Sequence, residues 1–240
     1  MKMKNLLFLA AFSILSFKGV SQGLNVNTSL QPEARHINTV VPRVEMLSFF
    51  QFERNYLPSS YVKADHITGK ATVADNWTKG DIVMKNEDII YANVDLNYNQ
   101  VEDKLFVKGN KGIVVLKNPV KEFTINDGDN LSYFRTGFPS VNGYDGETIY
   151  EVLKDGKFKL LKRVEKKIHV AVNYNLVIDK RYDESVKYFV NEGNRMYEIK
   201  PNLKSVQQAA TTHSLPVDNF LNDFSIRNES QLLALINKLP

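Results

Sequence analysis

The sequence predicts a mainly β protein of the α+β class, in which about ten antiparallel strands precede a small C-terminal helical segment. Between Ile90 and Tyr98 apolar residues alternate with polar ones, the period of a strand with one buried face. After Pro201 the apolar period becomes 3.6, as in helices. Strands followed by helices indicate an antiparallel sheet rather than βαβ units. A meander sheet, a sandwich and a partly closed barrel all fit this pattern.

The first strands are expected between residues 69 and 126, where short apolar runs alternate with polar turns. We expect a turn at Asn76–Gly80, and a polar outer face at Asn93, Asp95, Asn97 and Asn99. The run Ile113–Leu116 is continuously apolar, which indicates a more central strand. Pro119 should open the strand that follows it. The expected strands are Lys70–Ala74, Ile82–Met84, Ile89–Tyr98, Lys104–Lys108, Ile113–Leu116 and Val120–Ile125. The stretch Gly80–Asn126 is therefore predicted to be the central meander of the sheet.

The second half of the sequence also alternates apolar runs with polar turns, but its loops are longer. Asn126–Asn130 is a strong turn and Gly137–Gly146 a loop. Asp155-Gly156 predicts a hairpin, although a strict two-residue turn would oppose Lys154 and Lys157. Asp179–Ser185 is polar, and Asn191–Asn194 joins a final hairpin. The expected strands are Leu131–Arg135, Glu147–Lys154, Lys157–Val164, Ile168–Ile178, Val186–Val190 and Arg195–Ile199.

Three short helices should follow Pro201. Leu203, Val206 and Ala210 share one helical face, and Val217, Phe220, Leu221 and Phe224 share another, with Pro216 in the first turn. Asn228 suits the N-cap of the last helix, with Gln231 completing a capping box. Its apolar stripe is Leu232, Leu235, Ile236 and Leu239. Helices this short need the sheet or each other to cover their apolar faces.

The N-terminal segment resembles a signal peptide. Lys2 and Lys4 precede the apolar run Leu6–Phe17, which is too short to span a bilayer of roughly 30 Å. We expect cleavage near Ser21 and an exported protein, periplasmic, envelope-associated or secreted. With no cysteine in the chain, a lipoprotein anchor and a disulfide framework are excluded. The expected organisation is a signal peptide (1–21), a lead-in (22–68), a β domain (69–200) and a helical tail (201–240).

The charge balance gives no support for nucleic-acid binding. The formal net charge is 31 − 27 = +4, but Lys2, Lys4 and Lys18 belong to the predicted leader. Removing them leaves 28 − 27 = +1, so the mature chain is nearly neutral.

Sequence motifs for catalysis are missing. The chain has no HExxH, GxSxG, phosphate-binding GxxxxGK[ST] or GxGxxG motif. The four histidines, His36, His66, His169 and His213, lie in separate segments without ligand spacing. We therefore expect no catalytic residue, metal site or cofactor.

One basic concentration and a few aromatic residues are the candidate contact sites. The segment KFKLLKRVEKK could meet an anionic glycan or lipid headgroup through Lys157, Lys159, Lys162 and Arg163. The same alternation suits the solvent face of an edge strand, where lysines discourage edge pairing. Tyr144 and Tyr150 could line a ligand pocket or simply belong to the β core.

Several phrases of the chain resemble a group of uncharacterised exported proteins common in Bacteroidota. They are ITGKATVADNWTKGDIVMKN, VDLNYNQVEDKLFVK, VKEFTIN, GYDGETIYEVLKDGKFKLLKR and KYFVNEGNRMYEIKPNLKSV. The resemblance covers about residues 67–240 and implies an envelope or secreted β protein without a known activity.

Three functions remain open at this level. The first is a non-enzymatic envelope protein that binds a protein or glycan partner and exposes an apolar patch or an unpaired edge strand. The second is a lipid or small-molecule carrier with a large apolar cavity in a curled sheet. The third is an enzyme whose ionisable groups converge in one cleft.

Overall fold

The computed structural model describes residues 38–40, 67–85, 89–109, 112–116, 120–128, 130–172, 178–217, 221 and 225–239. The predicted signal peptide, most of the lead-in and most of the second predicted helix lie outside these residues. The elements are β1 (Asn38–Val40), β2 (Ile67–Thr68), β3 (Thr78–Met84), β4 (Ile89–Asn99), β5 (Lys104–Gly109), β6 (Gly112–Val115), β7 (Val120–Asp127), β8 (Asn130–Arg135), β9 (Tyr150–Lys154), β10 (Lys159–Val172), β11 (Ile178–Glu192), β12 (Arg195–Ile199), α1 (Leu203–His213) and α2 (Glu229–Asn237).

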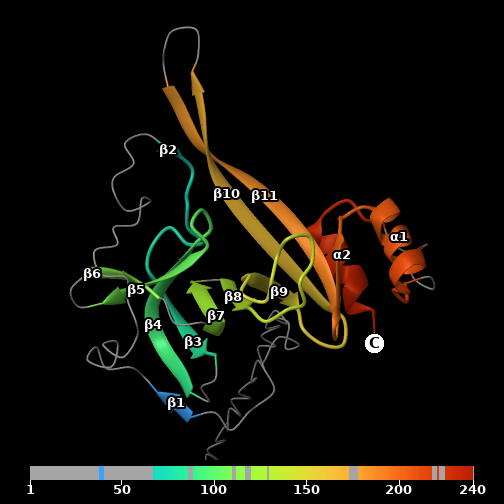
Figure 1. Ribbon diagram of the computed structural model, residues 1–240, viewed down its shortest axis with the longest axis horizontal. Coiled ribbons are helices and arrows are strands. Elements are labelled where there is room, and N and C mark those ends of the chain that lie inside the picture. The colour runs from blue at the N-terminus through green and yellow to red at the C-terminus, as the bar shows by residue number, and fades with distance from the viewer. Residues whose placement is uncertain are drawn as a thin grey trace, which may run out of the picture.

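The mainly β prediction is confirmed, and the architecture is one open sheet (Figure 1). Its main path runs β12-β11-β10-β9-β8-β7-β3-β4-β5-β6, and every pair along it is antiparallel. The short strands β1 and β2 pair with β4 and β11 in parallel, which makes the sheet mixed. Over the described residues the strands form one sheet that does not close on itself, so of the predicted alternatives the sandwich is not what the structure has.

The sheet consists of two meanders, because β3 to β6 and β7 to β12 each pair in sequence. Between them the chain returns from β6 to the other side of β3, where β7 pairs, so the predicted meander Gly80–Asn126 is interrupted before β7. The continuously apolar strand β6 therefore lies at the edge of the main path, and the prediction that it is more central is wrong. Its apolar residues are explained by packing instead, since Val115 and Leu116 are buried.

The outer face expected on β4 is wrong at Asn97 and Asn99, which are buried. The Asn97 side-chain amide donates to the carbonyl oxygens of Ala74 and Asn76, at 2.9 and 3.0 Å. Its Oδ1 accepts from the backbone N–H groups of Ala74 and Tyr98, at 3.3 and 2.9 Å. The Asn97 side chain thus makes hydrogen bonds to the segment 71–76 that a neighbouring strand would otherwise make. These bonds hold the segment over a face that alternation alone predicts to be exposed to solvent.

Two predicted element boundaries in and beside the segment 71–76 are wrong. Lys70–Ala74 is not a strand, since only Thr72 forms an isolated bridge, to Asn99. The predicted turn Asn76–Gly80 overlaps β3, which begins at Thr78. Gly80 sits at an irregularity of the β3–β4 register, and a Cβ there would lie 1.9 Å from the carbonyl oxygen of Thr124. The glycine is required because β7 approaches it so closely.

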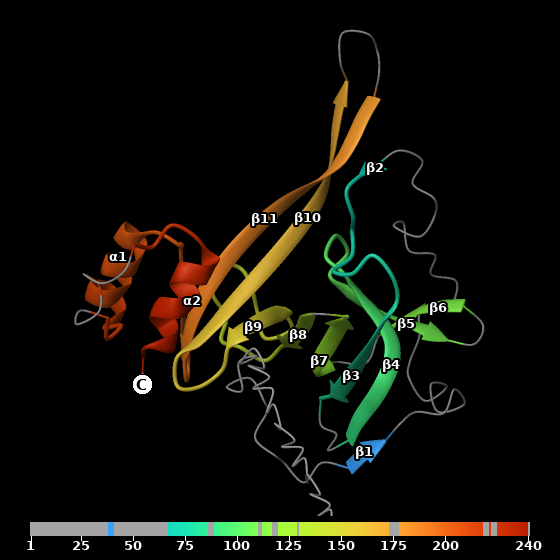
Figure 2. The ribbon, with the colours of Figure 1, turned by 180° about the vertical axis from the view of Figure 1, so that it is seen from behind.

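The two longest strands, β10 and β11, form a hairpin whose tip projects beyond the other described elements, although β2 pairs with β11 near it, at Lys180 and Arg181 (Figures 1 and 2). The prediction of one strand at Ile168–Ile178 is wrong, because Ile168–Val172 ends β10 whereas Ile178 begins the antiparallel strand β11, and residues 173–177 lie outside the described residues. The polar run Asp179–Ser185 lies inside β11. At the base, the predicted hairpin after β9 is present, but Lys154 pairs with Leu160 rather than facing Lys157.

The helices pack on the lower end of this hairpin, as Figure 2 shows from behind. Their apolar stripe joins β10, β11 and β12 in one core cluster, in which Leu232, Leu235 and Ile236 are fully buried. The predicted N-cap is confirmed, since Asn228 Oδ1 accepts from the N–H of Gln231. The Gln231 side chain reaches back to the N–H of Arg227. At the other end, Lys154 Nζ donates to the carbonyl oxygen of Ile236 at 2.6 Å and stabilises the helix C-terminus.

Candidate functional site

The six predicted contact residues lie near one another in the chain but do not form one site. Lys162 and Arg163 are consecutive on β10, so they point to opposite faces of the sheet. Tyr144 lies in the loop Gly137–Gly146 and Tyr150 on β9. Lys157 lies in the turn between β9 and β10, and Lys159 is the first residue of β10. The structure therefore divides the basic segment among a turn and two faces.

Tyr144 and Tyr150 come together in an aromatic cluster. Tyr150 packs edge-on against Phe189, with ring centroids 5.4 Å apart, and Tyr144 packs edge-on against the same ring at 5.6 Å. Phe138 closes the group at 5.6 Å from Tyr150. Tyr150 is fully buried, and burial raises the pKa of its hydroxyl. The loop 137–146 thus covers this face of the sheet with core packing.

Arg163 is buried and joins distant parts of the sheet. Its guanidinium donates to the Tyr98 hydroxyl at 2.6 Å, to Asp103 at 2.8 Å and to the carbonyl oxygen of Ile149 at 3.0 Å. The Tyr98 hydroxyl in turn donates to Asp103. Burial, and then the charge of Asp103, raise the pKa of Tyr98 well above its usual range. Since Tyr98 is on β4, five strands from β10 in the sheet order, this contact requires a strongly curved sheet.

Lys162 lies on the helical face in a second network. Its Nζ is 2.9 Å from Glu229 and 3.8 Å from Glu151. Tyr188 also donates to Glu229, at 2.9 Å. Burial raises the pKa of Glu151, opposed by the charge of Lys162. Because Glu229 belongs to the first turn of α2, this network holds the helix on the sheet.

The two turn lysines are also engaged inside the protein. Lys159 Nζ forms an ion pair of 2.9 Å with Asp155, which Arg135 contacts at the same distance. Lys157 Nζ lies 5.2 Å from the centroid of the Phe158 ring. The edge-strand interpretation of this basic segment is wrong at Arg163 and Lys166, which are 5% and 8% exposed. Anion contact by the six residues stays a prediction, and their described partners are intramolecular.

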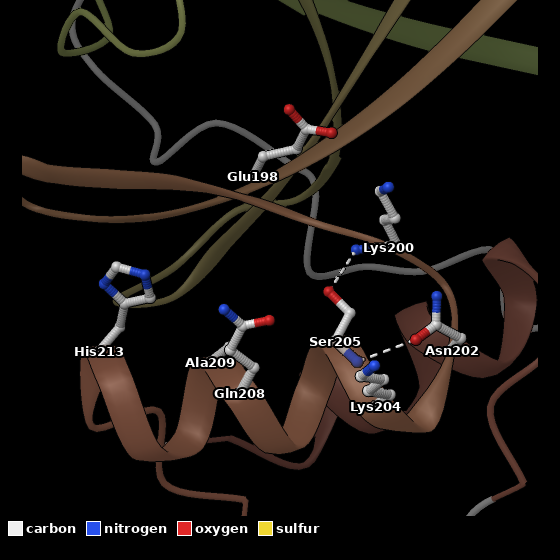
Figure 3. A pocket seen from close by; sticks show the side chains of 8 residues that line it. All are labelled: Glu198, Lys200, Asn202, Lys204, Ser205, Gln208, Ala209 and His213. Carbon is white, nitrogen blue, oxygen red and sulfur yellow. Dashed lines mark hydrogen bonds between the residues drawn. The ribbon is translucent and has the colours of Figure 1, made fainter.

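A polar groove of about 450 Å³ lies between β12 and α1 (Figure 3). Glu198 and Lys200 face it from the strand side, and Gln208 and His213 from the helix. Ser205 accepts from the Lys200 N–H and gives its own N–H to Asn202, the helix N-cap. His213 stacks on Tyr197, with ring centroids 3.9 Å apart. The groove residues thus mostly build the helix start and its packing on β12.

A small apolar crevice of about 80 Å³ lies on β3, β7, β8 and β9. Val83, Ile90 and Phe123 contribute its apolar lining, and Arg135 bridges Glu122 and Asp155 at its rim. Typical ligand pockets measure roughly 300–1,000 Å³. The crevice is thus too small for a lipid or a drug-sized molecule.

Three of the exposed large apolar side chains of the described residues gather on the upper half of the β10–β11 hairpin. We call this half, Lys167–Val172 with Ile178–Asp183, the arm. Ile168, Val170 and Val172 are 44%, 54% and 63% exposed. They occupy alternate positions, so they share one face, while Lys167, His169 and Ala171 share the other. We call these three apolar side chains the stripe.

The stripe coincides with an unpaired strand edge. Between β9, which reaches only Lys162, and the tip, β10 has β11 as its sole strand partner among the described residues. The N–H of Lys166 donates to the carbonyl oxygen of Gln100 at 3.2 Å, on the side away from β11. Beyond Lys166 no described segment pairs with this edge. In contrast, β2 covers the corresponding edge of β11 at Lys180 and Arg181.

The stripe was not predicted, although the sequence carries a signal for it. Ile168, Val170 and Val172 alternate with polar or small residues and predict a strand with one apolar face. Alternation does not tell whether that face meets a core, and here the three side chains belong to none of the core clusters of the described residues.

The chain matches no protein-family model, no curated protein and no solved structure in comparison with known proteins. Within the described ranges, no group of three or more histidine and acidic side chains could hold a metal ion. No helix in that part of the chain is long and apolar enough to cross a membrane.

Proposed function

We propose that this chain is an exported, non-enzymatic binding protein of the cell envelope, and that it binds its partner through the arm. The single observation that carries the proposal is the stripe. Three large apolar side chains on one face of a projecting hairpin are an unfavourable solvent contact unless another surface covers them. Export is supported by the sequence alone, through the leader Leu6–Phe17.

The buried polar groups support a non-enzymatic role. Arg163, Tyr98 and Asp103 bind one another, and Lys162 binds Glu229 and Glu151. Their pKa shifts arise from burial and internal pairing, which structural networks produce as readily as active sites. The carrier function is second, because the apolar crevice on β3 and β7 is small.

A photo-crosslinking experiment tests the proposal. Benzoylphenylalanine is placed at position 170, in the stripe, and in a matched control at position 167, on the opposite face of the same strand. In envelope extract we expect one defined adduct from position 170, identified by mass spectrometry, and none from position 167. The adduct should disappear when Ile168→Asp charges the stripe. Equal labelling from both positions, or none, would contradict a binding role of the arm.

A further inference from the structure

We infer that the partner presents an extended peptide strand, which adds to the free edge of β10 and carries apolar side chains at alternate positions with an acidic side chain between them. This inference rests on the proposed function and specifies its partner. Its basis is that the stripe residues are the same residues whose backbone groups have no hydrogen-bond partner among the described residues.

The backbone geometry identifies the free groups. In a β-strand the N–H and C=O of one residue point to the same side, and successive residues alternate between sides. The Lys166 N–H points away from β11, toward Gln100. The β10–β11 register continues without a shift to the Val172–Ile178 pair. The N–H and C=O groups of Ile168, Val170 and Val172 therefore also point away from β11, into the unpaired edge.

The side chains then define what the added strand must look like. Side chains at the same level of adjacent strands lie on the same face of a sheet. A strand placed along Ile168–Val172 would lay every second side chain beside the stripe. Main-chain hydrogen bonds would supply affinity, and the alternating apolar contacts would supply selectivity, as in other cases of β-strand addition.

Lys180 supplies the charge requirement. It pairs with Val170 across the hairpin and so lies on the stripe face. The other lysine of this face, Lys166, already has Glu184 at 3.6 Å, whereas Lys180 has no ion pair with any residue that the structure describes. An added strand would lie two strand spacings from β11, about 10 Å. A lysine and a glutamate side chain can meet over that span, so an acidic residue level with Val170 would complement the surface.

Two other occupants fit these observations less well. In a bilayer, the free N–H and C=O groups of the edge would lose their hydrogen bonds to water, at several kcal/mol each. A second copy of the chain would pair only over residues 168–172, whereas stable interfaces between folded proteins use about 20–30 residues a side. A peptide strand needs only the edge itself.

The test uses the palindromic peptide Thr-Val-Thr-Glu-Thr-Val-Thr, fluorescently labelled, which presents the same pattern in either strand direction. We expect saturable binding to the full chain by fluorescence polarisation. Two N-methylated forms, each blocked along one edge of the peptide, separate strand addition from general apolar contact. One form should bind like the parent, and the other should bind at least about tenfold more weakly.

Protein variants complete the test. Val170→Pro removes an N–H that faces out of the hairpin, so folding should be retained while peptide affinity falls about tenfold or more. Lys180→Glu should weaken binding of the parent peptide. It should bind a peptide with lysine in place of glutamate as tightly as the unaltered protein binds the parent. Lys167→Glu, the same charge change on the opposite face, should leave affinity unchanged.

The inference is overturned if both N-methylated peptides bind equally, if Val170→Pro binds like the parent, or if the peptide does not bind at all. It is also overturned if the stripe instead mediates binding to anionic phospholipid vesicles or a dimer in sedimentation. If position 170 still yields a defined protein adduct when the peptide fails, only strand addition is wrong. If that adduct is missing too, the proposed function falls with it.

Discussion

The lower and upper halves of the β10–β11 hairpin use the same two strands in opposite ways. In the lower half Leu160, Leu161 and Phe189 are fully buried, because the helices cover one face and the loop 137–146 the other. In the upper half Val170 and Val172 are mostly exposed. The lower half has adjacent apolar residues, Leu160-Leu161 on β10 and Tyr188-Phe189-Val190 on β11, and so offers an apolar surface on both faces. The upper half of β10 has large apolar residues only at alternate positions, on one face. An apolar face is thus buried within the chain only where a neighbouring element packs on it, as the helices and the loop 137–146 do in the lower half.

Truncating one apolar side chain in each half should give the largest contrast. Leu161→Ala removes a fully buried side chain and should lower the free energy of unfolding by about 3 kcal/mol. Val170→Ala, in the stripe, should change it by less than about 0.5 kcal/mol. Urea unfolding measures both. Similar losses in the two variants would mean that the stripe is packed in solution.

Replacing one arginine in each half of the hairpin should give the second-largest difference in stability. Arg163→Met leaves Asp103 and the Tyr98 hydroxyl without their buried partner, and we expect a loss of about 2–3 kcal/mol. Arg181→Met on the arm removes an exposed ion pair with Asp183 and should cost less than about 1 kcal/mol. Urea unfolding measures both variants. A larger loss of stability for Arg181→Met than for Arg163→Met would mean that the arm, and not the lower half, is the buried part of the hairpin.

Acid titration should destabilise the lower half first. Burial would raise the pKa of Asp155, but the Lys159 hydrogen bond and the Arg135 charge lower it to about 2. Because this folded pKa is below the unfolded value of about 3.9, the stabilisation is complete only above about pH 5 and is lost as the pH falls toward 2. We expect a loss of about 1–2 kcal/mol in that window. Asp155→Asn should flatten this part of the curve.

Helix capping gives the smallest expected effect. Lys154→Met removes the donor to the carbonyl oxygen of Ile236 at the end of α2 and should cost about 1 kcal/mol. Lys180→Met, on the arm, touches no helix and should leave stability unchanged. Thermal unfolding followed by circular dichroism measures both, and an unchanged midpoint for Lys154→Met would show that the cap is dispensable.

The candidate site was predicted only in pieces. The aromatic pair Tyr144 and Tyr150 does come together, but it does so in the core. The basic segment was treated as one patch, whereas strand geometry sends Lys162 and Arg163 to opposite faces, each toward its own acids. Those acids, Glu229 and Asp103, lie some 60 residues away along the chain in either direction, so no local pattern indicates them.

The sequence by itself determined what depends on local chemistry: the strand periods, most turns, the helix cap at Asn228, and the order of strands before helices. Only the tertiary structure decided which faces are covered. It buried Asn97 beneath the segment 71–76, moved β6 to an edge, and left the stripe open. The physical reason is that alternation sets the direction of side chains within a strand, while burial depends on which distant segment packs against that face.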